Sequence, residues 1–204
     1  MIKRSNKKSL WVSLGGNRII MGNIWLTSDW HFNHSKDFIY KPRGFKTVQE
    51  MNFNIINNFN QLVKYDDIVY CLGDCMLEDN IKGIHCMQQL NCQNIKIIPG
   101  NHCTDTRINL YKQYGFEVIG YATPLKYKGY HFYLSHYPTI TSNLDIDKPL
   151  NRRTINLCGH VHTQDKFLDM NKGLIYHVEL DAHNNYPVLI DDIIEDIKHY
   201  THTS

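Results

Sequence analysis

The sequence lacks an apolar run long enough to cross a lipid bilayer. A membrane-spanning helix needs about 20 consecutive apolar residues. The apolar stretch at residues 9–14 follows a basic start, but Gly15, Gly16, Asn17 and Arg18 end it at once. A secretion signal has a longer apolar region than this. We therefore expect a soluble, cytoplasmic protein with no membrane partner.

The chain also lacks an excess of charge of one sign and lacks CxxC pairs. Lys and Arg number 22, and Asp and Glu number 20, so nucleic acid is a possible partner but not the favoured one. Without an export signal, we expect reduced thiols rather than disulfides. A structural zinc site remains a minor alternative for the cysteines, which are Cys71, Cys75, Cys86, Cys92, Cys103 and Cys158.

The length and composition suit one domain. A chain of 204 residues with 42% hydrophobic residues can bury a substantial core. We predict a flexible N-terminal extension over residues 1–22 and a single domain over residues 23–204. Met21 lies just before the first predicted strand, so translation from Met1 and from Met21 are both open. The sequence does not indicate the oligomeric state.

Strand and helix patterns alternate through the first half of the chain. Short apolar runs predict strands at residues 23–28, 67–72 and 94–98. A capping box from Thr47 to Glu50 precedes an apolar stripe at helical spacing. Further helices are predicted at residues 81–90 and 105–114.

After residue 116 the pattern changes to short strands separated by turns. Strands are predicted at residues 117–119, 125–127, 130–134, 155–158, 174–180 and 188–190, with a last helix at 191–200. Residues 138–153 form a long connection without periodicity. The whole pattern predicts a mixed α/β (α+β) fold, in which two packed sheets form a β-sandwich flanked by helices.

Short polar clusters follow several of the predicted strands. Carboxylate, imidazole and amide groups are ligands for divalent metal ions. In extended backbone alternate residues point the same way, so we expect Asp29 with His31, and His160 with His162, each to bind metal from one side. Any one histidine has the plainer interpretation of a hydrogen-bonded structural residue. The clusters are Asp29-Trp30-His31, Gly73-Asp74, Gly100-Asn101-His102, His136 and Gly159-His160-Val161-His162.

In this order, the clusters resemble the calcineurin-like metallophosphoesterase superfamily, whose pattern runs DxH, GDxx, GNHD or GNHE, H, GHxH. The resemblance covers residues 29–162 and implies an αββα fold. It also implies that two divalent metal ions bind, with Asp74 between them and His102 as the catalytic histidine. The implied ligands of the first ion are Asp29, His31 and His162, and those of the second are Asn101, His136 and His160.

This resemblance implies a metal-dependent phosphoric ester hydrolase. Two cations acidify a shared water and stabilise the charge on phosphoryl oxygens. We expect Mn, with Fe, Zn, Co or Ni open. The favoured activity is that of a phosphodiesterase that hydrolyses a small nucleotide-derived substrate by attack of metal-bound hydroxide. The alternatives are a phosphomonoesterase, a nuclease and a non-catalytic scaffold of the same fold.

One residue departs from the superfamily pattern. Cys103 follows the catalytic histidine where the pattern has Asp or Glu, and a thiol is a weaker partner for an imidazole. Asp105 is a candidate replacement.

The segments DWHFNH, PRGF and SHYP resemble the small bacterial and bacteriophage branch of the superfamily. We select His34, Arg43 and Arg152 as candidate substrate contacts, with structural or surface roles as the alternative. Tyr40, Phe45 and Tyr137 are candidates for stacking on a base.

Overall fold

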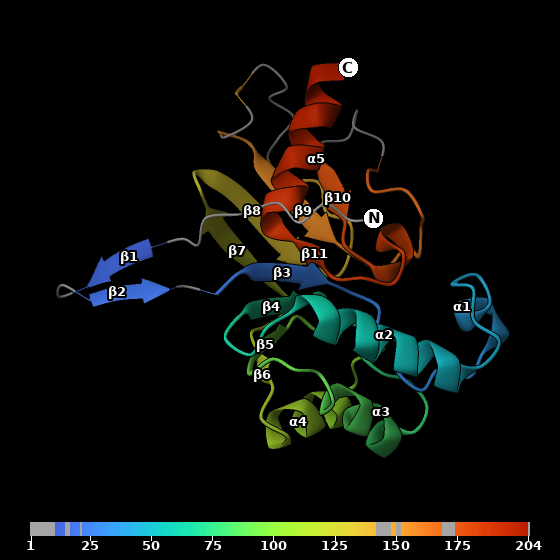
Figure 1. The fold of residues 1–204 in the computed structure, drawn as a ribbon. Coiled ribbons are helices and arrows are strands. Elements are labelled where there is room, and N and C mark those ends of the chain that lie inside the picture. Colours follow the sequence, from blue (N-terminus) through green and yellow to red (C-terminus); the bar gives the residue numbers. More distant parts are fainter. Residues whose placement is uncertain are drawn as a thin grey trace.

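Two sheets packed face to face form the centre of the computed structural model (Figure 1). The structure describes residues 11–14, 17–20, 22–141, 148–149, 152–168 and 174–203. In the larger sheet three strands run parallel to β3, and β11 pairs with β3 antiparallel. Its strands, in spatial order, are β11 (Val188–Leu189), β3 (Ile24–Thr27), β4 (Ile68–Cys71), β5 (Asn94–Ile97) and β6 (Glu117–Val118).

The second sheet has four strands. β10, β9 and β8 are parallel neighbours, and the hairpin turn at Lys128-Gly129 joins β8 to the antiparallel β7. Both sheets therefore present the carboxyl ends of parallel strands, where ligand sites commonly form. The strands in spatial order are β10 (Ile175–His177), β9 (Thr154–Cys158), β8 (Tyr130–Ser135) and β7 (Ala122–Tyr127).

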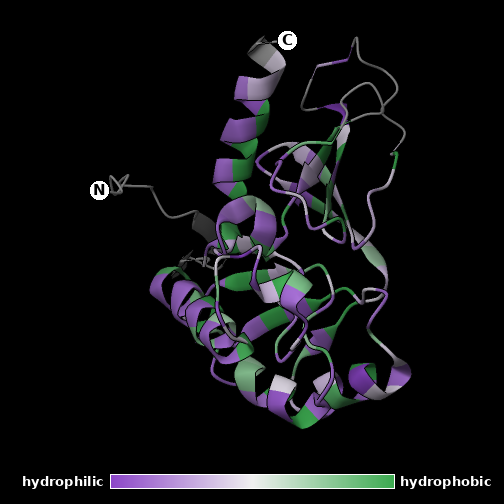
Figure 2. Ribbon diagram, turned by 90° about the vertical axis from the view of Figure 1, so that its right-hand side faces the viewer, coloured by the Kyte–Doolittle hydropathy of each residue, from purple (hydrophilic) through white to green (hydrophobic). Residues whose placement is uncertain are grey.

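Helices lie on both sides of the paired sheets (Figure 1). α2 (Val48–Leu62), α3 (Asn80–Met87) and α4 (Asp105–Gln113) cover the free face of the larger sheet, where one apolar cluster fills the space. A second cluster joins residues of both sheets to α5 (Ile190–Thr203). In Figure 2 the strands are mainly hydrophobic, and the helices alternate between hydrophilic and hydrophobic stretches. The predicted two-sheet αββα fold is confirmed.

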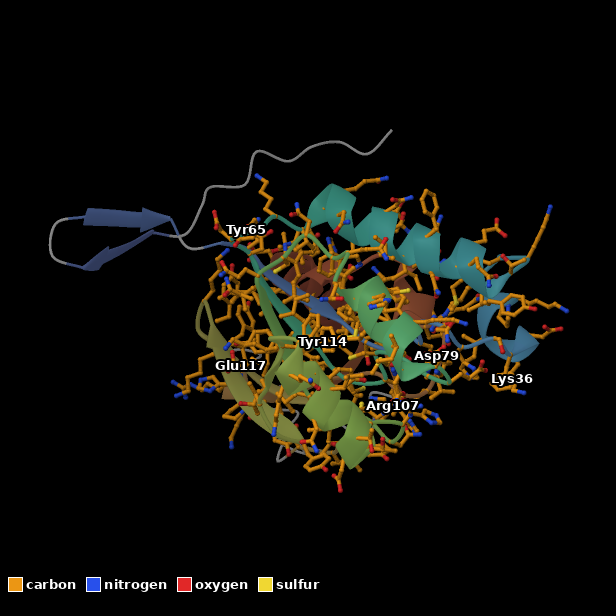
Figure 3. All side chains as sticks on the ribbon, turned by 90° about the horizontal axis from the view of Figure 1, so that it is seen from below. Lys36, Tyr65, Asp79, Arg107, Tyr114 and Glu117 are labelled. Atoms are coloured by element: carbon orange, nitrogen blue, oxygen red, sulfur yellow. The ribbon has the colours of Figure 1, made fainter. Side chains whose placement is uncertain are left out.

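Local capping determines where the helices begin. The Thr47 hydroxyl accepts the Glu50 amide N–H, as predicted, and the Glu50 carboxylate accepts the Lys46 amide N–H. Asp79 and Thr104 accept amide N–H groups at the starts of α3 and α4 in the same way. Asp79 and Arg107 lie on this outer helical side of the molecule, which Figure 3 shows from below. Each of these three helices therefore begins at a defined residue.

Several elements differ from the sequence-based expectation. The strand predicted over residues 174–180 ends at His177, and the 3₁₀ helix η3 (Leu180–His183) follows. The change occurs because the chain crosses to the other sheet, where Ser28 forms an isolated bridge with Glu179. The single-turn helix α1 (Asp37–Tyr40) was not predicted, because one turn carries too little periodicity.

The N-terminal extension contains a hairpin of β1 (Trp11–Leu14) and β2 (Asn17–Ile20). The remainder of the predicted flexible extension, apart from Gly22, lies outside the described residues, as do 142–147, 150 and 151 of the long connection. The six cysteines are free thiols, in agreement with the prediction. Within the described residues no helix is both long and apolar enough to cross a membrane.

We predict that His183 makes the stability of the fold depend on pH. Its Nε2–H donates to the His177 carbonyl oxygen (2.9 Å), and burial lowers the pKa of its imidazole to about 4. The unfolded chain takes up this proton near pH 6.5. The free energy of unfolding is therefore unaffected by His183 above pH 6.5. It decreases as the pH falls from 6.5 towards 4, by about 3 kcal/mol at most.

The measurement is urea unfolding of metal-stripped protein between pH 7.5 and 4.5. The His183→Gln variant keeps a donor but does not titrate, so its free energy of unfolding should fall less steeply with decreasing pH. Equal slopes for the variant and the wild type would contradict the prediction.

Candidate metal centre

The loops after β3 and β4 run side by side and carry three of the predicted ligands, Asp29, His31 and Asp74. The Asp29 amide N–H donates to the Gly73 carbonyl (3.0 Å), and the His31 amide N–H donates to the Asp74 carbonyl (2.9 Å). These bonds extend the parallel pairing of the two strands beyond the sheet. They place Asp29 and Asp74, both buried, at the same edge.

The backbone of the predicted ligands is left-handed rather than extended. The expectation that Asp29-x-His31 and His160-x-His162 lie in extended backbone is wrong, since φ is 57° at Asp29, 47° at His31, 76° at His160 and 55° at His162. Asp74 shares this conformation, with φ of 49°. Asp and His tolerate it better than most residues. The side chains converge because the loops curl, at a conformational cost of about 1–3 kcal/mol per residue.

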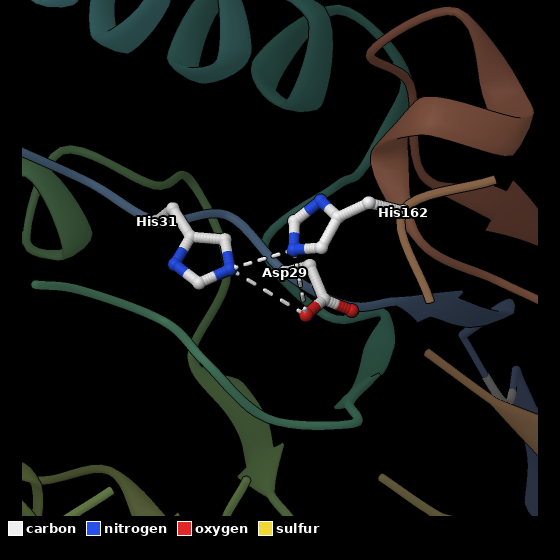
Figure 4. Close-up of side chains that lie close together, drawn as sticks. All are labelled: Asp29, His31 and His162. Carbon is white, nitrogen blue, oxygen red and sulfur yellow. Dashed lines mark hydrogen bonds and ion pairs between the residues drawn. The ribbon is translucent and has the colours of Figure 1, made fainter. Parts of the chain in front are cut away.

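Asp29, His31 and His162 form the first group of ligand atoms (Figure 4). The Nε2 atoms of the two histidines are 3.0 Å apart, and Asp29 Oδ1 lies 3.6 Å from His31 Nε2 and 3.7 Å from His162 Nε2. A divalent ion with ligand bonds of about 2.0–2.2 Å holds neighbouring ligand atoms about 3–3.6 Å apart. Asp29 Oδ1 is buried and has no hydrogen-bond partner among the described residues. This donor set fits a metal ion.

Asp74, Asn101, His136 and His160 form the second group. His136 Nε2 lies 3.4 Å from Asp74 Oδ2 and 2.9 Å from Asn101 Oδ1, which is also 3.0 Å from His160 Nδ1. His136 Nδ1–H donates to the Leu72 carbonyl (2.7 Å), so Nε2 keeps its lone pair for a metal ion. The structure thus brings all seven predicted ligands together.

Asp29 lies within reach of both groups, because its carboxylate also clusters with Asp74 and His136. Burial opposes ionisation of Asp29, but the histidines around it hold its pKa well below its usual range. The shared position of Asp29 was not predicted. The bridging role that the resemblance implies for Asp74 stays a prediction.

His162 has a carboxylate partner that the sequence analysis missed. Its Nδ1 lies 3.0 Å from Asp181 Oδ2, in η3, and Arg43 contacts the same carboxylate through Nη2 (2.6 Å) and Nε (3.0 Å). Burial opposes protonation of His162, but the hydrogen bond to Asp181 raises its pKa. Burial likewise opposes ionisation of Asp181, yet the hydrogen bonds from His162 and Arg43 lower its pKa to about 2. Such a carboxylate orients a metal-binding imidazole.

Arg43 serves the fold around the metal centre instead of facing a substrate. Its Nη2 also donates to the Asp29 carbonyl (2.8 Å), and its side chain is 1% exposed. The predicted substrate contact therefore finds no support in this geometry, because the guanidinium donors already bind Asp181 and the backbone. No local signal in the sequence connects Arg43 to Asp181, which is 138 positions away.

The glycines in the GN and GH motifs make room for ligand side chains. A Cβ atom at Gly100 would lie 2.3 Å from Asp74 Oδ1, and one at Gly159 would lie 2.2 Å from Asp29 Oδ2. Contacts this short do not occur. Each glycine therefore lets one loop approach the carboxylate of another.

His102 lies at the exposed side of the centre. Its amide N–H donates to Asp74 Oδ1 (3.0 Å), its carbonyl accepts from Arg107, and its ring lies edge-on to that of His31 with centres 5.7 Å apart. Burial raises the pKa of the Cys103 thiol, so this residue supplies no charge. Among the described residues no hydrogen bond joins Asp105 to the His102 ring. Within the part of the chain that the structure describes, no carboxylate replaces the acidic residue that follows the histidine in the superfamily pattern.

A cavity of about 260 Å³ opens beside the centre, and His102 lines it together with several predicted ligands. His34 and Phe38 also line it, and His34 Nδ1 lies 3.4 Å from Glu78 Oε1. Burial, with a smaller effect of His31, lowers the pKa of His34. The substrate roles of His34 and of Arg152, which is exposed and next to an undescribed segment, stay predictions.

Of the predicted stacking residues, Tyr137 lies near the centre, with its ring 4.7 Å from that of His160. Phe45 packs against the apolar core, and Tyr40 hydrogen-bonds to Asp37. Phe38 was missed, because nothing in its sequence neighbourhood distinguishes it.

Two sheets lie between helices, and Asp, His and Asn side chains gather at the ends of parallel strands. This arrangement agrees with the resemblance to the calcineurin-like metallophosphoesterase superfamily that the sequence motifs carry.

The chain is 34% identical over 182 residues to the uncharacterized protein MJ1445 of Methanocaldococcus jannaschii. The aligned region covers 86% of this chain and 91% of that protein. No family model matches the sequence.

One solved structure shares the fold. A protein of unknown function from Aquifex aeolicus, AQ665, superposes with a TM-score of 0.67 at 21% identity, over 85% of this chain and 98% of that one. The phosphoesterase YfcE of E. coli matches at a TM-score of 0.47 and 16% identity, over 77% and 78% of the two chains. The first likeness shows the fold, and the second is too distant to support a conclusion.

We predict that Gly100→Ala disrupts metal binding. The new methyl group would collide with the Asp74 carboxylate and displace it from His136. The amount of Mn²⁺ retained after dialysis, measured by plasma mass spectrometry, should fall below half of the wild-type value. Gly115→Ala is the matched control, because its Cβ meets nothing within 4 Å and only its φ of 87° is strained. Retention equal to that of the control would refute the steric explanation.

We also predict that Asp181→Asn weakens metal binding and destabilises the protein. The variant leaves the Arg43 charge buried without its partner, which costs about 3–5 kcal/mol, and it removes the anion that orients His162. The Kd for Mn²⁺ should rise about 10- to 100-fold. Asp191→Asn, which breaks a more exposed pair with Lys128, should change stability by about 1 kcal/mol or less. Unchanged Mn²⁺ affinity in Asp181→Asn would exclude the orienting role.

Proposed function

We propose that this protein is a phosphodiesterase that uses two divalent metal ions, with Mn favoured, to hydrolyse a small nucleotide-derived phosphodiester. The observation that carries the proposal is the convergence of seven oxygen and nitrogen ligands from five separate loops, with a buried Asp29 oxygen that has no hydrogen-bond partner among the described residues. Asp29, His31 and His162 would hold one ion, and Asn101, His136 and His160 would hold the other with Asp74. When bound, the ions would acidify water and neutralise phosphoryl charge.

The charge of the cavity supports a diester over a monoester. Within the described residues, no lysine or arginine lines the cavity that holds His102, and Arg43 is already paired with Asp181. A phosphomonoester carries up to two negative charges near neutral pH, whereas a diester carries one. A site with few free cations beyond the metal ions suits the smaller charge.

The chain's own residues supply the remaining chemistry. His102 lines the open cavity, and its backbone is held by Asp74 and Arg107. Its ring would donate a proton to the oxygen that leaves phosphorus, while water supplies the oxygen that replaces it. His34, on the wall of the same cavity, would donate a hydrogen bond to a phosphoryl oxygen. Without a carboxylate beside it, His102 is a weaker acid–base group than a paired histidine.

The test compares bis(p-nitrophenyl) phosphate with p-nitrophenyl phosphate, using metal-stripped protein supplied with Mn²⁺. We expect the diester to be hydrolysed faster, and we expect Asp74→Asn to abolish the activity. His102→Ala should lower kcat about 10²- to 10⁴-fold for an alkyl leaving group and less for nitrophenolate, which leaves without a proton.

The control is Asp191→Asn, which lies outside the centre and should keep full activity. Faster turnover of the monoester would overturn the diester preference. Absence of turnover of either ester with Mn, Fe, Zn, Co and Ni would overturn the proposed function.

A further inference from the structure

Phe38 is an exposed aromatic residue on the wall of the catalytic cavity. Its side chain is 70% exposed, whereas its neighbour Ile39 is 6% exposed and packs into the core. Its ring lies perpendicular to that of His34, with centres 5.6 Å apart. The ring therefore contacts the wall of the cavity and leaves much of its surface open.

The segment that carries Phe38 is held in place from both ends. Ile39 anchors α1 to the core, and an ion pair joins Asp37 to Lys41. Farther along, the Phe45 amide N–H donates to the Tyr40 carbonyl (3.0 Å), and the buried Arg43 pairs with Asp181. α1 stands beyond one end of α2 in Figure 1. The ring is thus presented on a preorganised support, which reduces the entropy lost when a ligand binds.

Phe38 shares its cavity with His102, the residue that faces the leaving group in the proposed reaction. A group that departs towards His102 would lie beside the Phe38 ring. Stacking needs a flat π system, and an exposed phenyl ring offers one without demanding particular hydrogen bonds.

We propose that Phe38 is a stacking platform for a nucleobase, so that the substrate carries a nucleoside on the leaving-group side of its phosphodiester. This inference rests on the proposed function for the position of the phosphate. It adds a residue that selects leaving groups that carry a base over those that carry the sugar alone.

The test measures the preference for a base by calorimetric titration of the Mn²⁺-loaded protein. The two probes are adenosine 5′-monophosphate and ribose 5-phosphate, which share the sugar phosphate and differ in the base. We expect the wild type to bind the nucleotide about 5- to 150-fold more tightly. Phe38→Ala should reduce this ratio to near one and leave the Kd of ribose 5-phosphate unchanged.

Two further variants separate stacking from other effects. Phe38→Tyr keeps the ring and should keep the preference. Phe53→Ala removes another exposed phenylalanine, which is 69% exposed on α2 and does not line the cavity, and it should also keep the preference. Because Phe38 is exposed, its replacement should leave the melting temperature and the Mn²⁺ content unchanged.

The outcomes distinguish this inference from the proposed function. A nucleotide preference that survives in Phe38→Ala, a wild type without a preference, or a failure of both probes to bind at millimolar concentration would each overturn the stacking role. A preference that depends on Phe38, in a protein that hydrolyses no ester, would overturn the hydrolase proposal and keep the base-binding site.

Discussion

Two buried carboxylates at one edge of a parallel sheet impose the constraint on which the rest of the structure depends. Asp29 is 0% exposed and Asp74 is 2% exposed, and a buried charge without compensation is unfavourable by several kcal/mol. The chain surrounds them with histidines and with the backbone N–H groups of His102 and His160, both of which donate to a carboxylate oxygen. One Asp29 oxygen still has no hydrogen-bond partner among the described residues. Cations held by the candidate ligands would complete this balance of charge.

Geometry at the centre comes from the loops, and rigidity comes from the sheets beneath them. Five of the seven predicted ligands have positive φ, a conformation that an isolated loop would not keep. Here the loop after β3 is hydrogen-bonded to the loop after β4, and both emerge from strands buried between two apolar clusters. Packing of the two apolar clusters, at a distance from the site, offsets the conformational free energy that the strained backbone costs.

The segment from residue 34 to residue 45 connects the metal centre to the cavity. Arg43 reaches inward to Asp181 and the Asp29 carbonyl, while Phe38 faces the opening beside His34. The same short stretch therefore supports His162 through Asp181 and shapes the space beside His102. A substitution at Arg43 would thus affect both the ligand geometry and the wall of the cavity.

Local sequence patterns determined the strands, the capped helices and the identity of the candidate ligands. Apolar runs such as that of β4, and the Thr47–Glu50 cap, act over a few residues, so they can be recognised in the sequence without a structure. The Asp, Asn and His clusters after the strands were visible for the same reason.

Only the tertiary structure decided which residues support those ligands and how the backbone presents them. Asp181 pairs with Arg43 across 138 positions, Phe38 meets the cavity through the placement of a single helical turn, and the DxH and HxH segments curl where extended backbone was expected. These features arise when distant loops share one space, and no short-range pattern encodes such contacts.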